Sequence, residues 1–313
     1  MARNTIKIKE SHKHHYGMLL KHLLKTDSLG RQGIDYLEKE GIEIVNLNEK
    51  ADIGISKHGD NVKGVKKENC ILWKGEPPIY FALWGRKLSN PRYMKNFFAV
   101  MSTSIEKHLN QYHFVVPQEF IHKKYFDNEK NKFLCMMLKN KKRNLKLNYL
   151  FPKLKKYNQK SLLEFREEYD KEFCNELSNE YDSYGRGWCE ECFKGRVPDK
   201  YKTIAQYKFN FCPENSRFNG YVTEKIIDAM TCGNIPIYLG APDIKEYVPE
   251  NCFIDASDFK SKSNLITFIK YFDSLEYNAY RKAIKEFINT DKSKYFSSVT
   301  FAKTLIKIIE ENW

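Results

Sequence analysis

The sequence contains no run of apolar residues long enough to cross a membrane. A membrane-spanning helix needs about 18 to 20 consecutive apolar residues, and no stretch of the 313 residues approaches that length. The start, Met1 to Glu10, alternates lysine with isoleucine instead of forming the apolar core of a signal peptide. We therefore expect a cytoplasmic protein, with peripheral contact at a membrane surface left open. Internal repeats and low-complexity tracts are also absent.

The cysteine pattern lacks the paired ligands of a structural zinc site. Eight cysteines are scattered along the chain, and only Cys189 and Cys192 form a Cys-x-x-Cys pair. A zinc site of the usual kind needs a second pair, and no other Cys-x-x-Cys or His-x-x-x-His is present. Without an export signal, we expect the cysteines to be reduced thiols, buried or at the surface, and a structural zinc site is the less favoured alternative.

Length and composition predict a folded chain of two domains with a cleft between them. At 313 residues the chain is longer than a single hydrophobic core usually accommodates. A hydrophobic content of 42% is ample for packed cores. The net charge of +13 favours anionic partners, and charge alone leaves a nucleotide, an anionic glycolipid, a membrane surface and nucleic acid all open.

The first third of the chain alternates strand-like and helix-like segments. Strands are expected near residues 6–8, 42–45, 53–55 and 70–73, and a helix across Met18–Leu24. This alternation is typical of an α/β sheet with helices on its faces.

The middle of the chain is rich in lysine and asparagine. We expect residues 128–160 to carry the passage between the two domains. A nucleic-acid patch is one interpretation of this charge, and a solvated helix face is the other. No recognition motif accompanies the charge, so we expect no nucleic-acid partner. A helix is expected over residues 162–173, and a tight loop at residues 184–188, where Gly185 and Gly187 flank an arginine.

Residues 207–240 are the most informative part of the sequence. Alternating aromatic residues predict a strand, which ends at the polar segment 214–220. Thr223 is positioned to serve as the N-cap of a helix that stops at Gly233, and residues 235–239 then form the next strand. The segment is one strand, loop, helix and strand.

Such a unit places its loop at the carboxyl edge of a sheet, where a helix start binds anions. Lys225 lies in the first helical turn, where the helix dipole disfavours a cation by about 0.3 to 1 kcal/mol. A phosphate bound by both the helix start and Lys225 explains why a lysine occupies this unfavourable position. The alternative is a helix capped by Thr223 and Glu224 with Lys225 solvated.

Three segments of this stretch closely resemble the donor-binding motif of the α1,3/α1,4-fucosyltransferases, glycosyltransferase family 10, above all its bacterial members. They are Pro-Glu-Asn-Ser from Pro213, Gly-Tyr-Val-Thr-Glu-Lys-Ile-Ile-Asp-Ala from Gly220, and Gly-Asn-Ile-Pro-Ile-Tyr-Leu-Gly from Gly233. The family usually has phenylalanine where this chain has Pro213. The detailed likeness covers residues 207–259, about a sixth of the chain.

The resemblance implies the GT-B architecture, in which two Rossmann-like α/β domains face each other across a cleft. Residues 1–130 are expected to form the N-terminal acceptor-binding domain, and residues 131–297 the C-terminal domain that binds GDP-fucose. Residues 298–313 are expected to form a C-terminal helix.

By position, the resemblance implies a set of residues that bind GDP-fucose. Lys225 is expected on the diphosphate, and Glu224 on the ribose or fucose. The full set is Glu214, Asn215, Ser216, Tyr221, Val222, Thr223, Glu224, Lys225, Lys146 and Arg186, the last from the Tyr184-Gly185-Arg186 turn that resembles the one preceding the motif.

Inverting sugar transfer needs a base for the acceptor hydroxyl and positive charge for the departing diphosphate. The family's proposed base lies in a Tyr-Thr-Gly-Glu-Asn type segment, which Trp73-Lys74-Gly75-Glu76-Pro77 resembles. Glu76 is therefore the expected base, against the alternative of a solvated loop glutamate. Arg143 is the expected second cation, because guanidinium binds phosphate bidentately, and Lys146 is its competitor.

The remaining expectations concern partners and rivals. The expected acceptor is an oligosaccharide or glycolipid, as in glycan or lipopolysaccharide biosynthesis. Since the chain has no Asp-x-Asp pair, we expect no obligatory cofactor, with Mn²⁺ or Mg²⁺ at most non-essential. A GT-B enzyme with another nucleotide-sugar donor and a basic binding module are the rival interpretations. Aromatic residues between Trp84 and Phe98 either stack on acceptor sugars or pack in the core.

Overall fold

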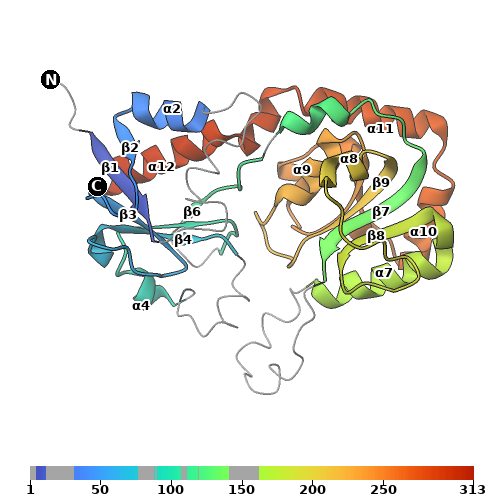
Figure 1. Ribbon diagram of the computed structural model, residues 1–313, viewed down its shortest axis with the longest axis horizontal. Helices are drawn as coiled ribbons and strands as arrows, with labels where there is room; N and C mark the ends of the chain where they lie inside the picture. Colours follow the sequence, from blue (N-terminus) through green and yellow to red (C-terminus); the bar gives the residue numbers. More distant parts are fainter. Residues whose placement is uncertain are drawn as a thin grey trace, which may run out of the picture.

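The computed structural model describes residues 5–11, 32–76, 88, 90–106, 111–118, 120–140 and 162–313. Within them the strands form two separate parallel sheets, which lie side by side in Figure 1. The first has the order β2 (Ile42–Ile44), β1 (Ile6–Glu10), β3 (Ile53–Lys57), β4 (Cys70–Lys74), β5 (Ala99–Ser102), β6 (Tyr112–His113). The second has the order β11 (Ile254–Asp255), β10 (Ile235–Leu239), β9 (Tyr207–Pro213), β7 (Lys132–Lys139), β8 (Tyr181–Arg186).

The first sheet confirms the strands predicted from the first third of the sequence. Its strand β4 packs apolar residues on both faces, as expected for a parallel sheet covered by helices. Along β4, Ile71 and Trp73 join one hydrophobic cluster, and Cys70 and Leu72 join another on the opposite face. The predicted helix across Met18–Leu24 lies outside the described residues.

The second sheet corrects two expectations. The lysine-rich middle does not serve as a connection throughout, because β7 within it pairs with both β8 and β9. Three consecutive buried residues, Leu134 to Met136, form the core of that strand. The expected tight loop at residues 184–188 is also displaced, since β8 continues through Arg186 and the chain turns only afterwards.

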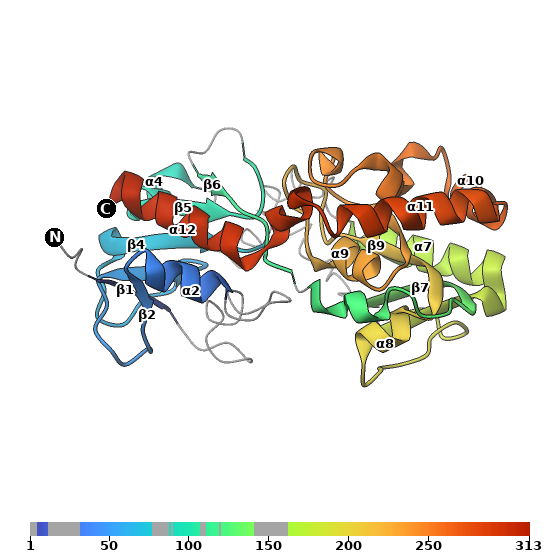
Figure 2. The same cartoon turned by 90° about the horizontal axis from the view of Figure 1, so that it is seen from above.

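Helices cover the faces of both sheets (Figures 1 and 2). Around the first sheet they are α2 (Gln32–Lys39) and α4 (Pro91–Met94). Around the second they are α7 (Leu163–Leu177), α8 (Lys200–Ile204), α9 (Glu224–Thr231), α10 (Lys262–Lys270) and α11 (Ser274–Phe287). The helix expected over residues 162–173 is thus confirmed as α7.

Each sheet together with the helices that cover it is called a unit, the first unit holding the first sheet and the second unit the second. The last helix, α12 (Ser298–Asn312), crosses back from the second unit to the first. Figures 1 and 2 show it leaving α11 and lying beside α2. Its buried residues Phe301, Leu305 and Ile308 join the hydrophobic cluster of the first sheet. Within the described residues, this helix gives the two units a second connection, besides the segment between β6 and β7.

Two of the aromatic residues that were candidates for stacking on acceptor sugars pack in the hydrophobic core. Phe97 is buried in a cluster with Met94, and Tyr93 packs against it. The core interpretation therefore holds for these two residues. Trp84 and Arg86 lie outside the described residues.

The expectation that every cysteine is a reduced thiol is wrong for two of them. Cys174 near the end of α7 and Cys192 after β8 form a disulfide, with their Cα atoms 5.8 Å apart. They lie 18 residues apart in the sequence, and their proximity arises from the packing of α7 beside β8. Among the described residues, no helix is long and apolar enough to span a membrane.

Candidate functional site

The loops that follow β4 and β9 meet between the two sheets. All strands within each sheet are parallel, so each sheet has one edge of carboxyl ends, where loops carry ligands in α/β folds. Ile105, shortly after β5, donates its N–H to Asn219 of the β9–α9 loop at 2.8 Å. The carboxyl edges of the two sheets therefore face each other.

The β9–α9 loop is organised around a fully buried carboxylate. Glu214 directly follows β9 and is 0% exposed. Its carboxylate accepts hydrogen bonds from the backbone N–H of Thr223 at 2.8 Å and from Lys225 Nζ at 2.9 Å. Glu214 thus closes the loop onto the start of α9 and points inward.

Thr223 occupies the N-cap position of α9, as predicted, but its side chain makes no cap hydrogen bond. Its hydroxyl donates to Glu214 at 2.8 Å and accepts from Lys225 Nζ at 2.6 Å. The N–H groups at the start of α9 consequently gain no partner from that side chain. A helix start without its side-chain cap keeps its capacity for an anion.

Lys225 is buried beside a carboxylate instead of projecting into solvent. Burial alone would lower the pKa of Lys225, but the carboxylates of Glu214 and Glu224 outweigh that effect and the net pKa is raised. The side chain of Lys225 is 8% exposed, whereas that of Glu224 is 48% exposed. The lysine therefore stays charged at neutral pH in a site that excludes most water.

Arg166 is a second buried cation, which the sequence analysis did not identify. It lies in the first turn of α7, is 2% exposed, and donates from Nη2 to the backbone oxygen of Pro213 at 2.7 Å. It is close enough to Lys225 to oppose that lysine's protonation. Nothing in the sequence indicated that Arg166 belongs to the site, because it is one charged residue in an amphipathic helical segment. Only the packing of α7 brings it to the end of β9.

Two helix starts converge on the same loop. α9 begins at Glu224, directly after the loop. The N–H of Leu162, which precedes α7, donates to the backbone oxygen of Asn215 in the loop at 3.1 Å. Each helix start carries a partial positive charge, so their fields add to those of Lys225 and Arg166.

Tyr221 joins this loop to the candidate base on the other sheet. Asn215 Nδ2 donates to the Tyr221 hydroxyl at 3.4 Å, and that hydroxyl donates to Glu76 Oε2 at 3.4 Å. Glu76 follows β4 by two residues, as the sequence predicted for a side chain at a strand's carboxyl end. The fold therefore brings Glu76 to the cation-bearing loop.

A buried ion pair holds the backbone before Glu76. Lys74, at the end of β4, is 0% exposed and pairs with Glu106. Its backbone oxygen accepts from the N–H of Thr103 at 3.1 Å. Because Lys74 is fixed by both its side chain and its backbone, the Gly75-Glu76 turn leaves the sheet at a defined point.

The other predicted site residues lie around this centre in different ways. Val222 is fully buried, so it supports the loop and offers only its backbone. Ser216 is also buried, and its hydroxyl has no hydrogen-bond partner within the described part of the chain. Arg186 is exposed at the carboxyl end of β8. Arg143 and Lys146 lie outside the described residues.

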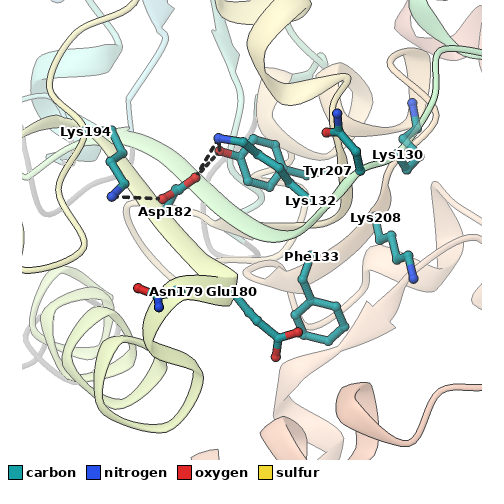
Figure 3. Close-up of a pocket in the computed structure, with 10 residues that line it drawn as sticks. Lys130, Lys132, Phe133, Asn179, Glu180, Asp182, Lys194, Tyr207 and Lys208 are labelled. Atoms are coloured by element: carbon teal, nitrogen blue, oxygen red, sulfur yellow. Dashed lines mark hydrogen bonds and ion pairs between the residues drawn. The ribbon is translucent and has the colours of Figure 1, made fainter.

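A polar cavity of about 460 Å³ lies at the edge of the second sheet formed by the amino ends of its strands, away from the β9–α9 loop (Figure 3). It is lined by residues at the starts of β7, β8 and β9, among them Lys132, Asp182 and Tyr207. Asp182 accepts from Lys132 at 3.0 Å and pairs with Lys194 at 3.5 Å. Since these are amino ends of parallel strands, this cavity is separate from the loops described above.

Two Rossmann-like units with facing carboxyl edges and a cationic loop between them define the GT-B class of glycosyltransferase fold. A solved structure of an α1,3-fucosyltransferase with GDP-fucose has this fold, with a TM-score of 0.61 and 19% sequence identity. The alignment covers 99% of this chain and 92% of that one.

Residues 156–306 match the C-terminal domain of glycosyltransferase family 10 (fucosyltransferase). This stretch, just under half of the chain, is thus similar to that domain. An α-(1,3)-fucosyltransferase, FucT, of Helicobacter pylori is 41% identical over 122 residues. An α-(1,4)-fucosyltransferase of Arabidopsis thaliana is 36% identical over 84 residues.

These two alignments cover 37% and 25% of this chain. They span 25% and 21% of the length of the respective relatives. The match to the family model lies within residues 156–306, whereas the structural likeness extends over both units.

Proposed function

We propose that this protein transfers L-fucose from GDP-fucose to a hydroxyl of a GlcNAc- or Glc-containing glycan, with inversion, to form an α1,3 or α1,4 linkage. The observation that carries the proposal is the Glu76–Tyr221 contact, which joins a carboxylate of one sheet to the cationic loop of the other. A displacement reaction needs a general base for the acceptor and positive charge for the leaving group, on opposite sides of one sugar carbon.

In this proposal the diphosphate binds where Lys225, Arg166 and the starts of α7 and α9 converge. Both cations are buried, so their attraction to phosphate is weakly screened. Glu214 holds Lys225 in position and keeps it protonated. As the bond between fucose C1 and the diphosphate oxygen breaks, negative charge accumulates on the leaving group. Fixed positive charge then stabilises the transition state more than the ground state.

Glu76 takes the proton of the acceptor hydroxyl while that oxygen attacks C1 from the face opposite the diphosphate. The hydrogen bond from Tyr221 orients the carboxylate toward the loop, and the buried Lys74–Glu106 pair fixes the turn behind it. One displacement inverts the anomeric configuration, and no covalent sugar–enzyme intermediate is required.

The remaining loop residues complete the donor site in this proposal. The buried Ser216 hydroxyl, which lacks a protein partner among the described residues, is available to the donor. Asn215, Glu224 and Arg186 offer further hydrogen bonds around the nucleotide and sugar. Arg166 takes the role that was expected of Arg143 or Lys146.

The proposal assigns acceptor binding to residues 1–130 and donor binding to residues 131–297, with residues 298–313 as the helix that rejoins the first unit. The first test is calorimetric titration with GDP, GDP-fucose, GDP-mannose and UDP-sugars. Turnover is then measured with lactose, N-acetyllactosamine and type 1 chains, followed by linkage analysis. GDP binding and fucose transfer are expected. A folded protein that binds no guanosine diphosphate would overturn the proposal.

A further inference from the structure

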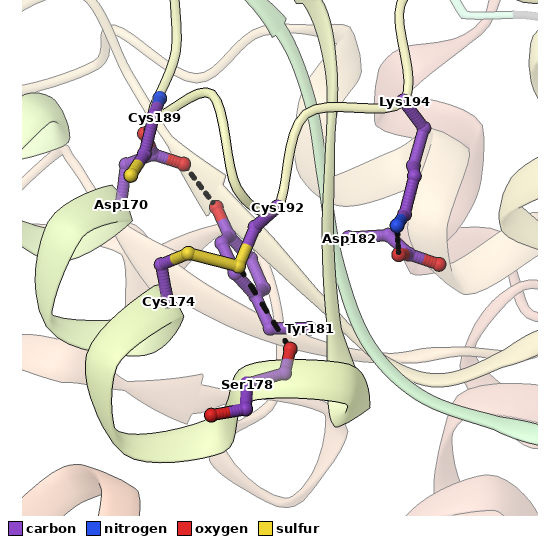
Figure 4. Close-up of a disulfide and its surroundings, with 8 residues drawn as sticks. All are labelled: Asp170, Cys174, Ser178, Tyr181, Asp182, Cys189, Cys192 and Lys194. Carbon is purple, nitrogen blue, oxygen red and sulfur yellow. Dashed lines mark hydrogen bonds and ion pairs between the residues drawn. A yellow bond between two sulfur atoms is a disulfide. The ribbon is translucent and has the colours of Figure 1, made fainter.

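Three cysteines gather where α7 ends and the loop after β8 begins (Figure 4). Cys174 on α7 is bonded to Cys192, and Cys189 lies three residues before Cys192. The sulfur atoms of Cys174 and Cys189 and a carboxylate oxygen of Glu191 all lie within 4.8 Å of one another. A helix and the four-residue segment Cys-Glu-Glu-Cys thus place four potential metal ligands together.

The backbone around these ligands is held independently of the disulfide. The N–H of Cys189 donates to Asp170 Oδ2 at 2.7 Å, and Oδ1 of the same carboxylate accepts from the Tyr181 hydroxyl at 2.8 Å. Asp170 lies one helical turn before Cys174, so it anchors the segment over that cysteine (Figure 4). The N–H of Ser183 in β8 donates to the backbone oxygen of Cys192 at 2.9 Å.

We propose that reduction of the Cys174–Cys192 disulfide creates a Zn²⁺ site formed by Cys174, Cys189, Cys192 and Glu191. A tetrahedral zinc site has Zn–S distances of about 2.3 Å, which places its sulfur atoms about 3.8 Å apart. The separations within this cluster are compatible with that geometry after the bonded sulfurs move apart. Tertiary packing supplies, in Cys174, the ligand that the isolated Cys-x-x-Cys pair lacked in the sequence.

The donor atoms favour zinc over the hard divalent cations. Three thiolates are soft ligands, which select Zn²⁺, whereas Mg²⁺ and Mn²⁺ prefer sites made of oxygen atoms. A carboxylate is an established fourth ligand of zinc. The hydrogen bond from the Cys189 backbone to Asp170 acts as an outer support of the kind that orients metal ligands.

The conversion requires a low-molecular-weight thiol of the glutathione class as reductant. Two such thiols form one disulfide, while the sulfurs of Cys174 and Cys192 each gain one electron and one proton. Zn²⁺ then displaces three thiol protons and forms three Zn–S bonds. Oxidation removes the metal by the reverse reaction, so the disulfide and the zinc site exclude each other.

Either state connects the end of α7 to the loop after β8. The site therefore serves as a cross-link of the second unit whatever the thiol redox conditions. It lies toward the opposite end of α7 from Arg166, which is in the first helical turn. Its test is accordingly independent of GDP binding and fucose transfer.

The experiment uses the full-length protein, treated with a chelator and prepared in two forms, disulfide-bonded and phosphine-reduced. Each is titrated with Co²⁺ and then Zn²⁺. The reduced form is expected to show thiolate-to-cobalt charge-transfer bands and the intense visible bands of tetrahedral Co²⁺, which Zn²⁺ abolishes at one equivalent. The disulfide-bonded form is expected to show neither. A reduced protein without these bands would contradict the zinc site.

Matched variants identify the ligands. Cys189→Ala is expected to weaken Zn²⁺ binding at least a hundredfold, whereas Cys252→Ala, at a buried cysteine of the same unit that lies outside the disulfide, leaves it unchanged. Glu191→Gln is expected to weaken binding about tenfold, and Glu190→Gln to have no effect. Equal binding by each variant and its control rejects the site. If Cys189→Ala does not fold, a zinc-dependent rise in the melting temperature of the reduced wild type still tests it.

Discussion

The hydroxyl of Tyr221 lies 3.4 Å from a carboxylate oxygen of Glu76, although the two residues belong to different sheets. The same hydroxyl accepts from Asn215 within the β9–α9 loop. The geometry of the candidate base is therefore coupled to the geometry of the candidate donor loop. Four predictions test this arrangement and the fold beneath it.

Replacing Glu76 with glutamine is expected to lower the rate of fucose transfer by about 10²- to 10⁴-fold, the usual contribution of a general base. Affinity for GDP is expected to stay within a few fold, because the diphosphate contacts are elsewhere. Steady-state transfer assays and calorimetry measure the two quantities. Glu68→Gln, an exposed glutamate of the same unit, is the control. Normal transfer by Glu76→Gln would show that another group takes the proton.

The substitution Lys225→Met is expected to abolish GDP binding and to destabilise the fold. It leaves the carboxylate of Glu214 buried without its cation, and breaking a buried pair in this way costs about 3 to 5 kcal/mol. Adding Glu214→Gln is expected to recover much of the stability in urea unfolding, but none of the GDP affinity. Lys208→Met, on the exposed side of β9, controls for the loss of a charge. GDP affinity unchanged in Lys225→Met refutes the assignment.

Arg166→Lys is expected to weaken GDP binding by about 10- to 100-fold, corresponding to loss of a charge-assisted hydrogen bond of about 1.5 to 3 kcal/mol. GMP binding is expected to fall much less, because it lacks the second phosphate. Calorimetry with both nucleotides separates the two effects, and Arg92→Lys, at an exposed position of helix α4, is the control. Equal losses for GDP and GMP would mean that Arg166 supports the fold without contacting the diphosphate.

Gly233→Ala is expected to destabilise the protein more than Gly41→Ala. Both glycines follow helices with a positive φ, 75° and 79°, so alanine meets backbone strain of about 1 to 2 kcal/mol at either position. At Gly233 a Cβ atom would also lie 2.2 Å from the backbone oxygen of Phe126, whereas at Gly41 nothing lies within 4 Å. Thermal unfolding of the two variants measures the difference, and equal melting temperatures are the contrary outcome.

Local sequence pattern predicted most of the strands and the strand, loop, helix and strand unit around Lys225. It succeeded there because apolar periodicity and glycine stops reflect interactions between near neighbours. It failed at β7, where lysines at both ends of the strand concealed a buried centre of Leu134 to Met136. It also failed to predict the disulfide, because Cys174 and Cys192 come together only through packing of α7 beside β8.

The sequence by itself determined the parallel α/β architecture, the resemblance to the fucosyltransferase family and the loop on which the proposed chemistry centres. Each depends on a contiguous pattern, so each can be read without knowing the fold. Only the tertiary structure decided that Glu214 is buried beneath Lys225, that Arg166 lies beside them, and that Tyr221 reaches Glu76. Those contacts join residues from different strands and helices, and their distances are fixed by how the two sheets and their helices pack.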